Sequence, residues 1–214
     1  MPTKRFENLD PERRNAILDA ARVEFGRSGF ERASLNEIIR AAGISKGSLY
    51  YYFEDKLDLY MTIARQMMSE VMEIIGWEAF GGESDDFWGD LENLYERMMC
   101  YMVDHPEVVR FGWDARQLMH SPVVSSAFSE MMERGFEIFR DILRKGQQMG
   151  AVRTDVPLDL LASALYYMGE GMDFWVFDHW NELSSQERNK IMKFYSEFAK
   201  KIAGTSNYQG DSES

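Results

Sequence analysis

Apolar residues recur every three or four positions through most of this chain, which is the spacing of α-helices with one buried face. Ile17, Ala21 and Phe25 share such a face, and a longer apolar stripe runs from Leu57 to Val71 with the same period. The apolar–polar alternation of β-strands is nearly absent, and the short β-branched runs lack hairpin turns. The pattern therefore predicts an all-α protein.

Residues that favour helix ends divide this pattern into separate helices. Four side chains suited to capping a helix N-terminus precede predicted helices: Asp10, Ser34, Ser45 and Asp55. Ser34 also has Glu37 three residues later, the spacing of a capping box. Gly29 and Gly43 interrupt the apolar pattern. After these N-terminal helices, and a long one beginning near residue 56, we expect helices over about 86–104, 106–118, 122–147, 157–180 and 185–203.

Composition narrows the class of protein. The chain has 214 residues, 45% of them hydrophobic, so a sizeable core is expected. No apolar run reaches the roughly 18 residues of a membrane span, and no signal segment opens the sequence. The single cysteine, Cys100, excludes an internal disulfide and fits a reducing compartment. We therefore expect a cytoplasmic protein without a membrane partner.

Charge is distributed unevenly along the chain. The formal net charge is −12, yet residues 1–56 hold ten basic and nine acidic side chains. Residues 57–214 hold 14 basic and 27 acidic side chains, so this part would repel a polyanion that the first part tolerates. The asymmetry predicts one domain over residues 1–56 and a second, with different partners, over 57–203. The polar residues 204–214 are expected to be a disordered tail.

The two short helices joined by residues 42–45 have the pattern of a helix-turn-helix, whose second helix enters the DNA major groove. Leu49 and Phe53 are four residues apart and are expected to anchor that helix inward. The remaining residues of its sequence SKGSLYYYF are left to face DNA: Ser45, Lys46, Gly47, Ser48, Tyr50, Tyr51 and Tyr52. The alternative is that the tyrosines simply pack between helices.

Basic residues outside this helix offer further phosphate contacts. Lys56 lies in the first turn of the next predicted helix, where its charge would suit a phosphate. Lys4 and Arg5 lie on an N-terminal arm that we expect to be mobile, and either side chain would add a contact of the same kind.

Residues 11–60 resemble the DNA-binding domain of TetR-type (tetracycline-repressor-like) bacterial regulators. The resemblance rests on Ala20, Ala21, Phe25, Gly29-Phe30, Ser34-Leu35-Asn36-Glu37-Ile38, Ala42-Gly43-Ile44-Ser45-Lys46-Gly47, Leu49-Tyr50-Tyr51-Tyr52-Phe53, Lys56 and Leu59. It implies an N-terminal three-helix DNA-binding domain joined to a C-terminal helical domain for effector binding and dimerisation. It also implies a homodimer on double-stranded operator DNA, usually as a repressor, with Ser34 among the DNA contacts.

The C-terminal half offers two candidate surfaces. The apolar segment from Leu165 to Phe177 and the amphipathic helix from Phe128 to Leu143 would form a dimer seam; the alternative is that both are core of a single chain. Expected interface residues are Phe128, Met132, Phe136, Phe139, Leu143, Leu165, Met168 and Met172. Aromatic, methionine and charged residues suggest a pocket for a small, lipophilic effector: Trp77, Tyr95, Met99, Met102, Phe111, Trp113, Arg116, Tyr166, Glu170 and Asp173.

Each of these pocket residues also has a plainer interpretation. The apolar ones would serve equally as core, and Arg116, Glu170 and Asp173 would serve equally in ion pairs. The acidic balance of this half favours a neutral or cationic effector.

Sequence features of enzymes and cofactor proteins are absent. The three histidines and Cys100 lack metal-ligand spacing, and neither a nucleophile elbow nor a glycine-rich phosphate loop occurs. No metal, cofactor or enzymatic activity is therefore expected. The competing hypothesis is a helical DNA-binding protein with a structural or division-linked role and no small-molecule effector.

Overall fold

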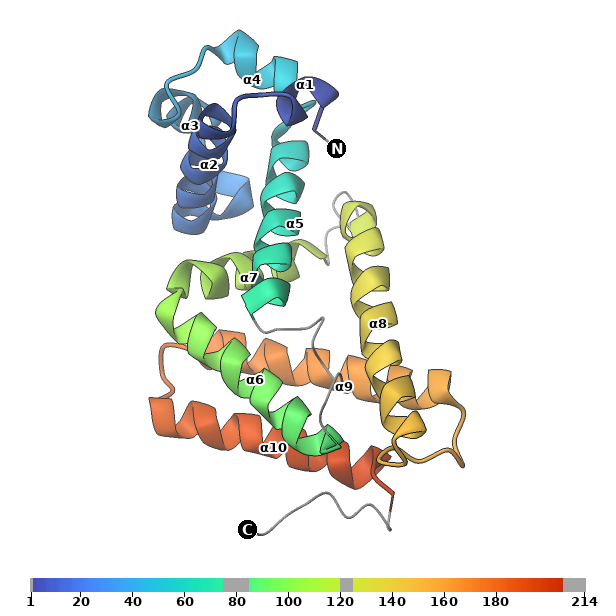
Figure 1. The fold of residues 1–214 in the computed structure, drawn as a ribbon. Helices are drawn as coiled ribbons and strands as arrows, with labels where there is room; N and C mark the ends of the chain where they lie inside the picture. Colours follow the sequence, from blue (N-terminus) through green and yellow to red (C-terminus); the bar gives the residue numbers. More distant parts are fainter. Residues whose placement is uncertain (1, 75–84, 120–124, 206–214) are drawn as a thin grey trace. The chain divides into compact units, whose positions relative to one another are not determined.

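A computed structural model describes residues 2–74, 85–119 and 125–205. Helices make up most of these ranges (Figure 1) and are α1 (Lys4–Glu7), α2 (Pro11–Arg32), α3 (Leu35–Ala41), α4 (Lys46–Tyr52), α5 (Lys56–Ile74), α6 (Phe87–Asp104), α7 (Pro106–Met119), α8 (Ser125–Gln148), α9 (Leu158–His179) and α10 (Ser185–Ala203). The described ranges contain no strand, only a single β-bridge between Val152 and Gly204. The all-α prediction is confirmed.

The described helices form two compact units, and each is described by itself. The first unit comprises residues up to 70 together with 105–129, and the second comprises 71–104 together with 130 onward. The helix bounds agree with the predicted ones within a few residues. The exception is α1, a single turn too short to leave an apolar pattern. The predicted functional boundary at residue 56 stays a prediction.

Side-chain caps begin the N-terminal helices at the expected residues. Asp10, Ser45 and Asp55 each accept a backbone N–H two or three residues further on, at 2.8–3.0 Å. Gly29 and Gly43 have φ angles of 70° and 64°, in the left-handed region where a side chain is strained. Gly29 therefore kinks α2 near its end, and Gly43 sets the turn between α3 and α4.

The predicted capping box of α3 is only half present. Ser34 Oγ accepts the Glu37 N–H at 3.4 Å, as expected. The prediction of the reciprocal bond, from the Ser34 N–H to the Glu37 side chain, is wrong. The Ser34 N–H donates to Glu24 at 3.0 Å, and Glu37 pairs with Arg40. Glu24 is only 6% exposed, and a buried carboxylate requires donors. The carboxylate of α2 thereby fixes the start of α3.

Tyr60, on α5, lies at the centre of the core of the first unit and has no exposed surface. Its ring stacks on Phe111 of α7 at 4.6 Å and meets the edges of Phe25 and Phe30 at 5.0 and 5.1 Å. Its hydroxyl donates to Asp114 Oδ2 at 2.9 Å, and the Phe30 N–H donates to the same oxygen at 2.9 Å. One carboxylate of α7 therefore holds both α5 and the end of α2.

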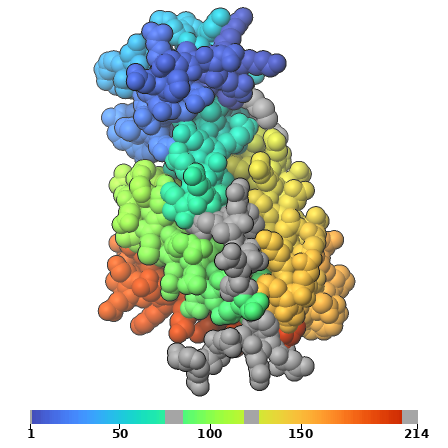
Figure 2. All heavy atoms as spheres, viewed as in Figure 1, coloured from blue at the N-terminus to red at the C-terminus, as the bar shows by residue number. Residues whose placement is uncertain are grey.

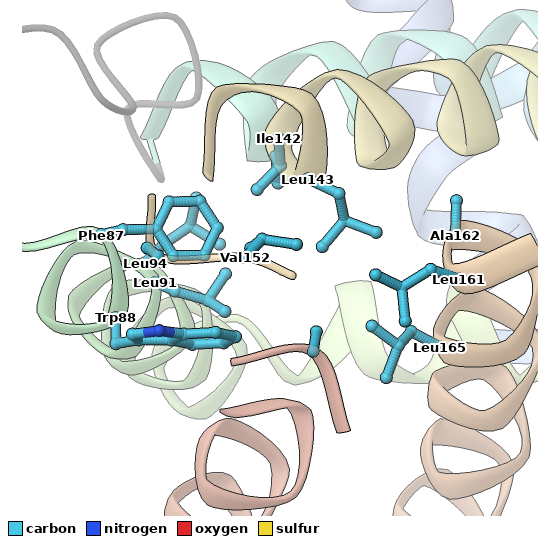
Figure 3. Close-up of a cluster of buried hydrophobic side chains, with 12 residues drawn as sticks. Phe87, Trp88, Leu91, Leu94, Ile142, Leu143, Val152, Leu161, Ala162 and Leu165 are labelled. Carbon is cyan, nitrogen blue, oxygen red and sulfur yellow. The ribbon is translucent and has the colours of Figure 1, made fainter. Parts of the chain in front are cut away.

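The core of the second unit lies between α6, α8, α9 and α10, as Figure 3 shows. Its buried members are Phe87, Trp88, Leu91, Leu94, Ile142, Leu143, Ala151, Val152, Leu161, Ala162, Leu165 and Ala203. The connection from α8 to α9 is part of this core, because Val152 is buried and the Arg153 N–H donates to Ala203 O at 2.8 Å. A Cβ on Gly146 would lie 2.4 Å from a Val152 methyl, so this close approach requires glycine.

Candidate nucleic-acid interface

The outward face of α4 carries most of the residues predicted to contact DNA. Ser45, Lys46 and Gly47 are exposed, and the side chains of Tyr50 and Tyr51 are each 50% exposed. Leu49 and Phe53 are 2% and 1% exposed, and they anchor the helix inward, as expected. In the space-filling view, residues of α1 to α4 form a continuous surface in blue and cyan (Figure 2). The helix therefore presents one polar and aromatic face outward and is anchored by a buried apolar pair.

Gly47 has no steric reason for being glycine within the protein. A Cβ built there would meet only Ser45 Oγ, at 3.8 Å, which is an ordinary contact distance. The φ angle of Gly47 is not positive, so alanine would fit the backbone at this position. Glycine costs a helix up to about 1 kcal/mol relative to alanine. The absence of a side chain is therefore explained better by something that approaches α4 from outside.

The two serines at the start of α4 are already engaged with each other. Ser45 Oγ accepts the Ser48 N–H at 3.0 Å and lies 2.8 Å from Ser48 Oγ. A hydroxyl has one donor and two acceptor positions, so each retains capacity for an outside group. Ser34 is half-buried and caps α3. A hollow of about 220 Å³ opens beside these serines, between α2 and the turn, and Arg13 lies on its wall.

The three tyrosines of α4 have different surroundings. Tyr50 and Tyr51 have half of their surface open, whereas Tyr52 is half-buried against Phe6, with ring centroids 6.0 Å apart. Phe6 belongs to α1 and is itself buried, so the N-terminal segment is seated on α4. The expectation of a mobile arm is wrong for this reason.

Lys56 has partners within the protein. Its Nζ donates to the carbonyl oxygens of Glu31 at 3.0 Å and Ala33 at 3.4 Å, and it lies 4.9 Å from the centre of the Phe30 ring. The ammonium therefore ties the end of α2 to the start of α5. Its predicted contact with a DNA phosphate stays a prediction, for which one N–H donor is left.

The residues predicted to line an effector pocket fall in different units. Tyr95, Met99, Met102, Tyr166, Glu170 and Asp173 belong to the second unit, Phe111, Trp113 and Arg116 to the first, and Trp77 lies outside the described residues. Phe111 packs on Tyr60, and Trp113 is 44% exposed. Tyr166 packs across Phe136 and Phe139 of α8, at 5.4 and 5.9 Å.

Asp173 is the centre of a polar cluster inside the second unit. Tyr195 of α10 donates its hydroxyl to Asp173 Oδ1 at 3.3 Å, and the ring of Tyr95 lies 6.1 Å from that of Tyr195. Burial, and then the Asp173 carboxylate, raise the pKa of Tyr95 to about 12. Sequence reasoning missed Tyr195 because it stands in a regular amphipathic pattern on α10. The structure therefore brings together Tyr95 and Asp173 and adds a third polar group.

The second unit has a hollow of its own, which this cluster does not line. It has a volume of about 480 Å³, is open, and is lined by Ile74, Asn93, Glu96, Arg97, Cys100, Tyr101 and Asp104. None of the predicted effector residues within the described ranges lines it. Across the described ranges, no group of three His, Cys, Asp or Glu side chains is placed to hold a metal ion. Nor does any described helix have the length and apolar character needed to cross a membrane.

The predicted dimer residues differ in how much surface they expose. Phe128, Leu143 and Leu165 are 1%, 3% and 4% exposed in a single chain, so they have almost no surface to give to a partner. In the structure these three residues are core residues. The ring centroids of Phe128 and Tyr60 are 6.4 Å apart in the first unit, and the two leucines lie in the core of the second. The half-buried predicted residues are Met132, Phe136, Phe139, Met168 and Met172.

Comparison with known proteins agrees with this geometry. Residues 17–62 match the sequence profile of bacterial regulatory proteins of the tetR family. The HTH-type transcriptional repressor AcnR of Corynebacterium glutamicum is 27% identical over 164 residues, which are 74% of this chain and 78% of that one.

Solved structures show the same fold along most of the chain. The fatty acid degradation regulator FadR of Bacillus halodurans has a TM-score of 0.71 at 15% identity, covering 91% of this chain and 99% of that one. The transcriptional regulator FadR of Bacillus subtilis, solved in complex with stearoyl-CoA, has a TM-score of 0.70 at 16% identity, covering 86% and 96%.

A helix-turn-helix with an exposed second helix, in a chain whose relatives are named as transcriptional repressors, defines a DNA-binding transcriptional regulator rather than an enzyme. Residues 17–62 are the DNA-binding domain of the tetR family of bacterial regulatory proteins.

Proposed function

We propose that this protein is a repressor that binds operator DNA as a homodimer through α4 and leaves it when a small lipophilic effector binds. The observation that carries the proposal is the exposed face of α4, where Lys46, Tyr50 and Tyr51 flank Gly47. Nothing inside the protein would prevent a larger side chain at that position. Lysine and tyrosine donors suit phosphates, and a helix stripped of one side chain admits a base edge or sugar closely. Ser34, Ser45, Ser48, Tyr52 and Lys56 complete the proposed contacts.

The homodimer would use the exposed face of α9. Leu160, Tyr167 and Trp175 are 61%, 66% and 50% exposed, and their spacing places them on one side of the helix together with Ala164 and Gly171. Large apolar side chains that gather on one exposed face are typical of an interface. The half-buried residues of α8 and α9 named above would extend it. Proteins on operators with two half-sites need such a two-fold contact.

A charge substitution on this face tests the dimer. Tyr167→Glu combined with Trp175→Glu should convert a dimer to a monomer in sedimentation equilibrium, because burying two carboxylates costs several kcal/mol. Phe194→Glu is the matched control, since Phe194 is a large apolar residue that is 54% exposed on another helix, α10. A dimer that persists in the double variant would place the interface elsewhere.

The effector is proposed to be lipophilic, with the Asp173 cluster as its polar anchor. The second unit is rich in methionine and aromatic residues, and such surfaces adapt to apolar ligands of varied shape. The FadR of Bacillus subtilis was solved with stearoyl-CoA, and that protein has the same fold. Because Asp173 is acidic and Tyr95 and Tyr195 flank it, a neutral or cationic lipophile fits this cluster better than an anionic one.

The function is tested by selection from random-sequence duplexes with the purified protein. The expected result is an enriched, near-palindromic motif whose half-sites are about 34–36 Å apart, or a multiple of that distance. The selected duplex is then titrated with neutral, cationic and anionic lipophiles, with stearoyl-CoA as the anionic one. Release by a neutral or cationic lipophile supports the effector proposal. Absence of any enriched motif would refute operator binding, and DNA release by none of the lipophiles would refute the effector class.

A further inference from the structure

The short helix α1 is fixed to the C-terminal end of α4. Phe6 is 3% exposed, and its ring lies 4.6 Å from that of Phe53 and 6.0 Å from that of Tyr52. Thr3 adds two hydrogen bonds, from its N–H to Tyr52 O at 3.0 Å and from its hydroxyl to Tyr51 O at 3.2 Å. The last carbonyls of a helix have no partner within the helix, so Thr3 supplies what α4 lacks there.

This support matters because α4 has only seven residues. A helix of that length is not stable by its own hydrogen bonds and depends on tertiary packing. The residues that match the family profile begin at Ile17, so α1 lies outside the matched part of the chain. The contacts of α1 are therefore a feature of this chain that the family match does not account for.

Arg5 of α1 lies beside the face of α4 that is proposed to meet DNA. Its guanidinium carbon is 4.2 Å from the centre of the Tyr51 ring. Arg5 is exposed, and half of the Tyr51 surface is open, so both side chains are accessible to the same outside group. The guanidinium faces a ring rather than a carboxylate, so its N–H donors remain available for an anion.

Stacking on an aromatic ring also limits where the guanidinium can go. An arginine held in this way loses less conformational freedom on binding a phosphate than one that moves freely. Its planar fork suits two parallel hydrogen bonds to phosphate oxygens. Since residues 1–56 are nearly neutral overall, each well-placed cation makes up a large share of the attraction to DNA.

We propose that α1 is a fixed part of the DNA-binding surface and that Arg5, held on the Tyr51 ring, binds a DNA phosphate beside α4. The proposal rests on the proposed function, because it needs DNA on α4. Phe6 is then a positioning residue: it acts on DNA only by keeping Arg5 and the end of α4 in place.

The experiment measures the affinity of the full-length protein for the selected duplex as a function of salt concentration. Each phosphate contact contributes about 0.9 to the slope of log K against log salt, and a dimer carries two copies of Arg5. Arg5→Ala should therefore lower the magnitude of the slope by about 2. Arg5→Lys keeps the charge and should keep most of the slope. Lys201→Ala, which removes one exposed charge from α10, should leave the slope unchanged.

Arg5 is the preferred position for the test because it is exposed, so its replacement does not empty a buried site. Phe6→Ala should lower the slope as much as Arg5→Ala does, provided that circular dichroism shows that the protein is still folded. A wild-type slope in Arg5→Ala would overturn this inference and leave the proposed function standing. A protein without any DNA binding would overturn both.

Discussion

Gly47→Ala is expected to change stability and DNA binding in opposite directions. The added methyl group meets nothing closer than Ser45 Oγ at 3.8 Å, and the backbone at this position suits alanine. The gain is the ordinary difference between glycine and alanine in a helix, roughly 0.5–1 kcal/mol. For a protein of this length, that difference raises the melting temperature by about 1–4 °C.

The effect on DNA binding follows from the position of Gly47 on the exposed face of α4. If a base edge or sugar approaches the Cα, a methyl group there separates the helix from the groove. A displaced base contact costs about 1–3 kcal/mol, and a dimer has two such positions. The affinity of the dimer for its selected duplex should fall by about 30-fold or more.

Gly43→Ala, in the turn just before α4, is the matched control. A Cβ at Gly43 would meet nothing within 4 Å, but its φ angle of 64° strains an alanine. This variant should lose about 1 kcal/mol of stability, so the two alanine variants should shift the melting temperature in opposite directions. Differential scanning calorimetry gives the melting temperatures, and fluorescence anisotropy gives the affinities. A Gly47→Ala protein that is more stable and binds DNA as tightly as the wild type would mean that no base edge or sugar approaches the Cα of Gly47.

Three further variants test contacts that join α2 to α3, α2 to α5, and α5 to α7. Lys56→Met should lower the melting temperature by about 2–4 °C, because a hydrogen-bonded ammonium between α2 and α5 contributes about 1 kcal/mol. An unchanged melting temperature would mean that Lys56 does not stabilise the fold, and would leave DNA contact as its proposed role. Tyr60→Phe should destabilise the protein by about 1–3 kcal/mol in urea titration, because Asp114 loses a buried donor; a loss near zero would contradict this. Burial opposes ionisation of Glu24, but the Ser34 N–H and neighbouring donors outweigh it and hold its pKa below the ordinary 4.5. Ionised Glu24 therefore stabilises the fold above about pH 4.5, and this stability is lost as the pH falls through the lowered pKa. The wild type should therefore lose stability more steeply in acid than Glu24→Gln does.

Local chemistry explains which parts of the fold could be predicted from sequence. A cap such as Asp10 or Ser45 acts over two or three residues, so the sequence alone places it. The reciprocal half of the α3 cap could not be predicted in this way. Its acceptor, Glu24, comes ten residues earlier and reaches Ser34 only after α2 and α3 have packed.

Helices that are apolar on several sides account for the errors in the dimer surface. The sequence marks Leu165 and Tyr167 as apolar neighbours on α9, yet Leu165 is 4% exposed and Tyr167 is 66% exposed. Which side of such a helix faces inward depends on where α6, α8 and α10 pack. The Asp173 cluster has a similar origin, because its hydroxyl donor, Tyr195, is 22 residues away on another helix.

The α4 residues themselves were accessible to sequence reasoning because a helix-turn-helix fixes the inward pair, Leu49 and Phe53, and so leaves the others outward. The contacts of α1 could not be predicted from the sequence, because a helix of four residues is too short to show a hydrophobic periodicity. Only the folded chain shows that Arg5 and Phe6 reach the Tyr51–Phe53 end of α4.

DNA binding through α4 is tested by the affinity of Lys46→Ala and Tyr50→Phe for the selected duplex. Both side chains are exposed, so neither change should alter the melting temperature by more than a degree or two. Each change should weaken specific binding at least ten-fold, because each removes a charged or hydroxyl donor from both half-sites. Wild-type affinity in both variants, with the duplex still bound specifically, would contradict the claim that α4 is the DNA-binding helix.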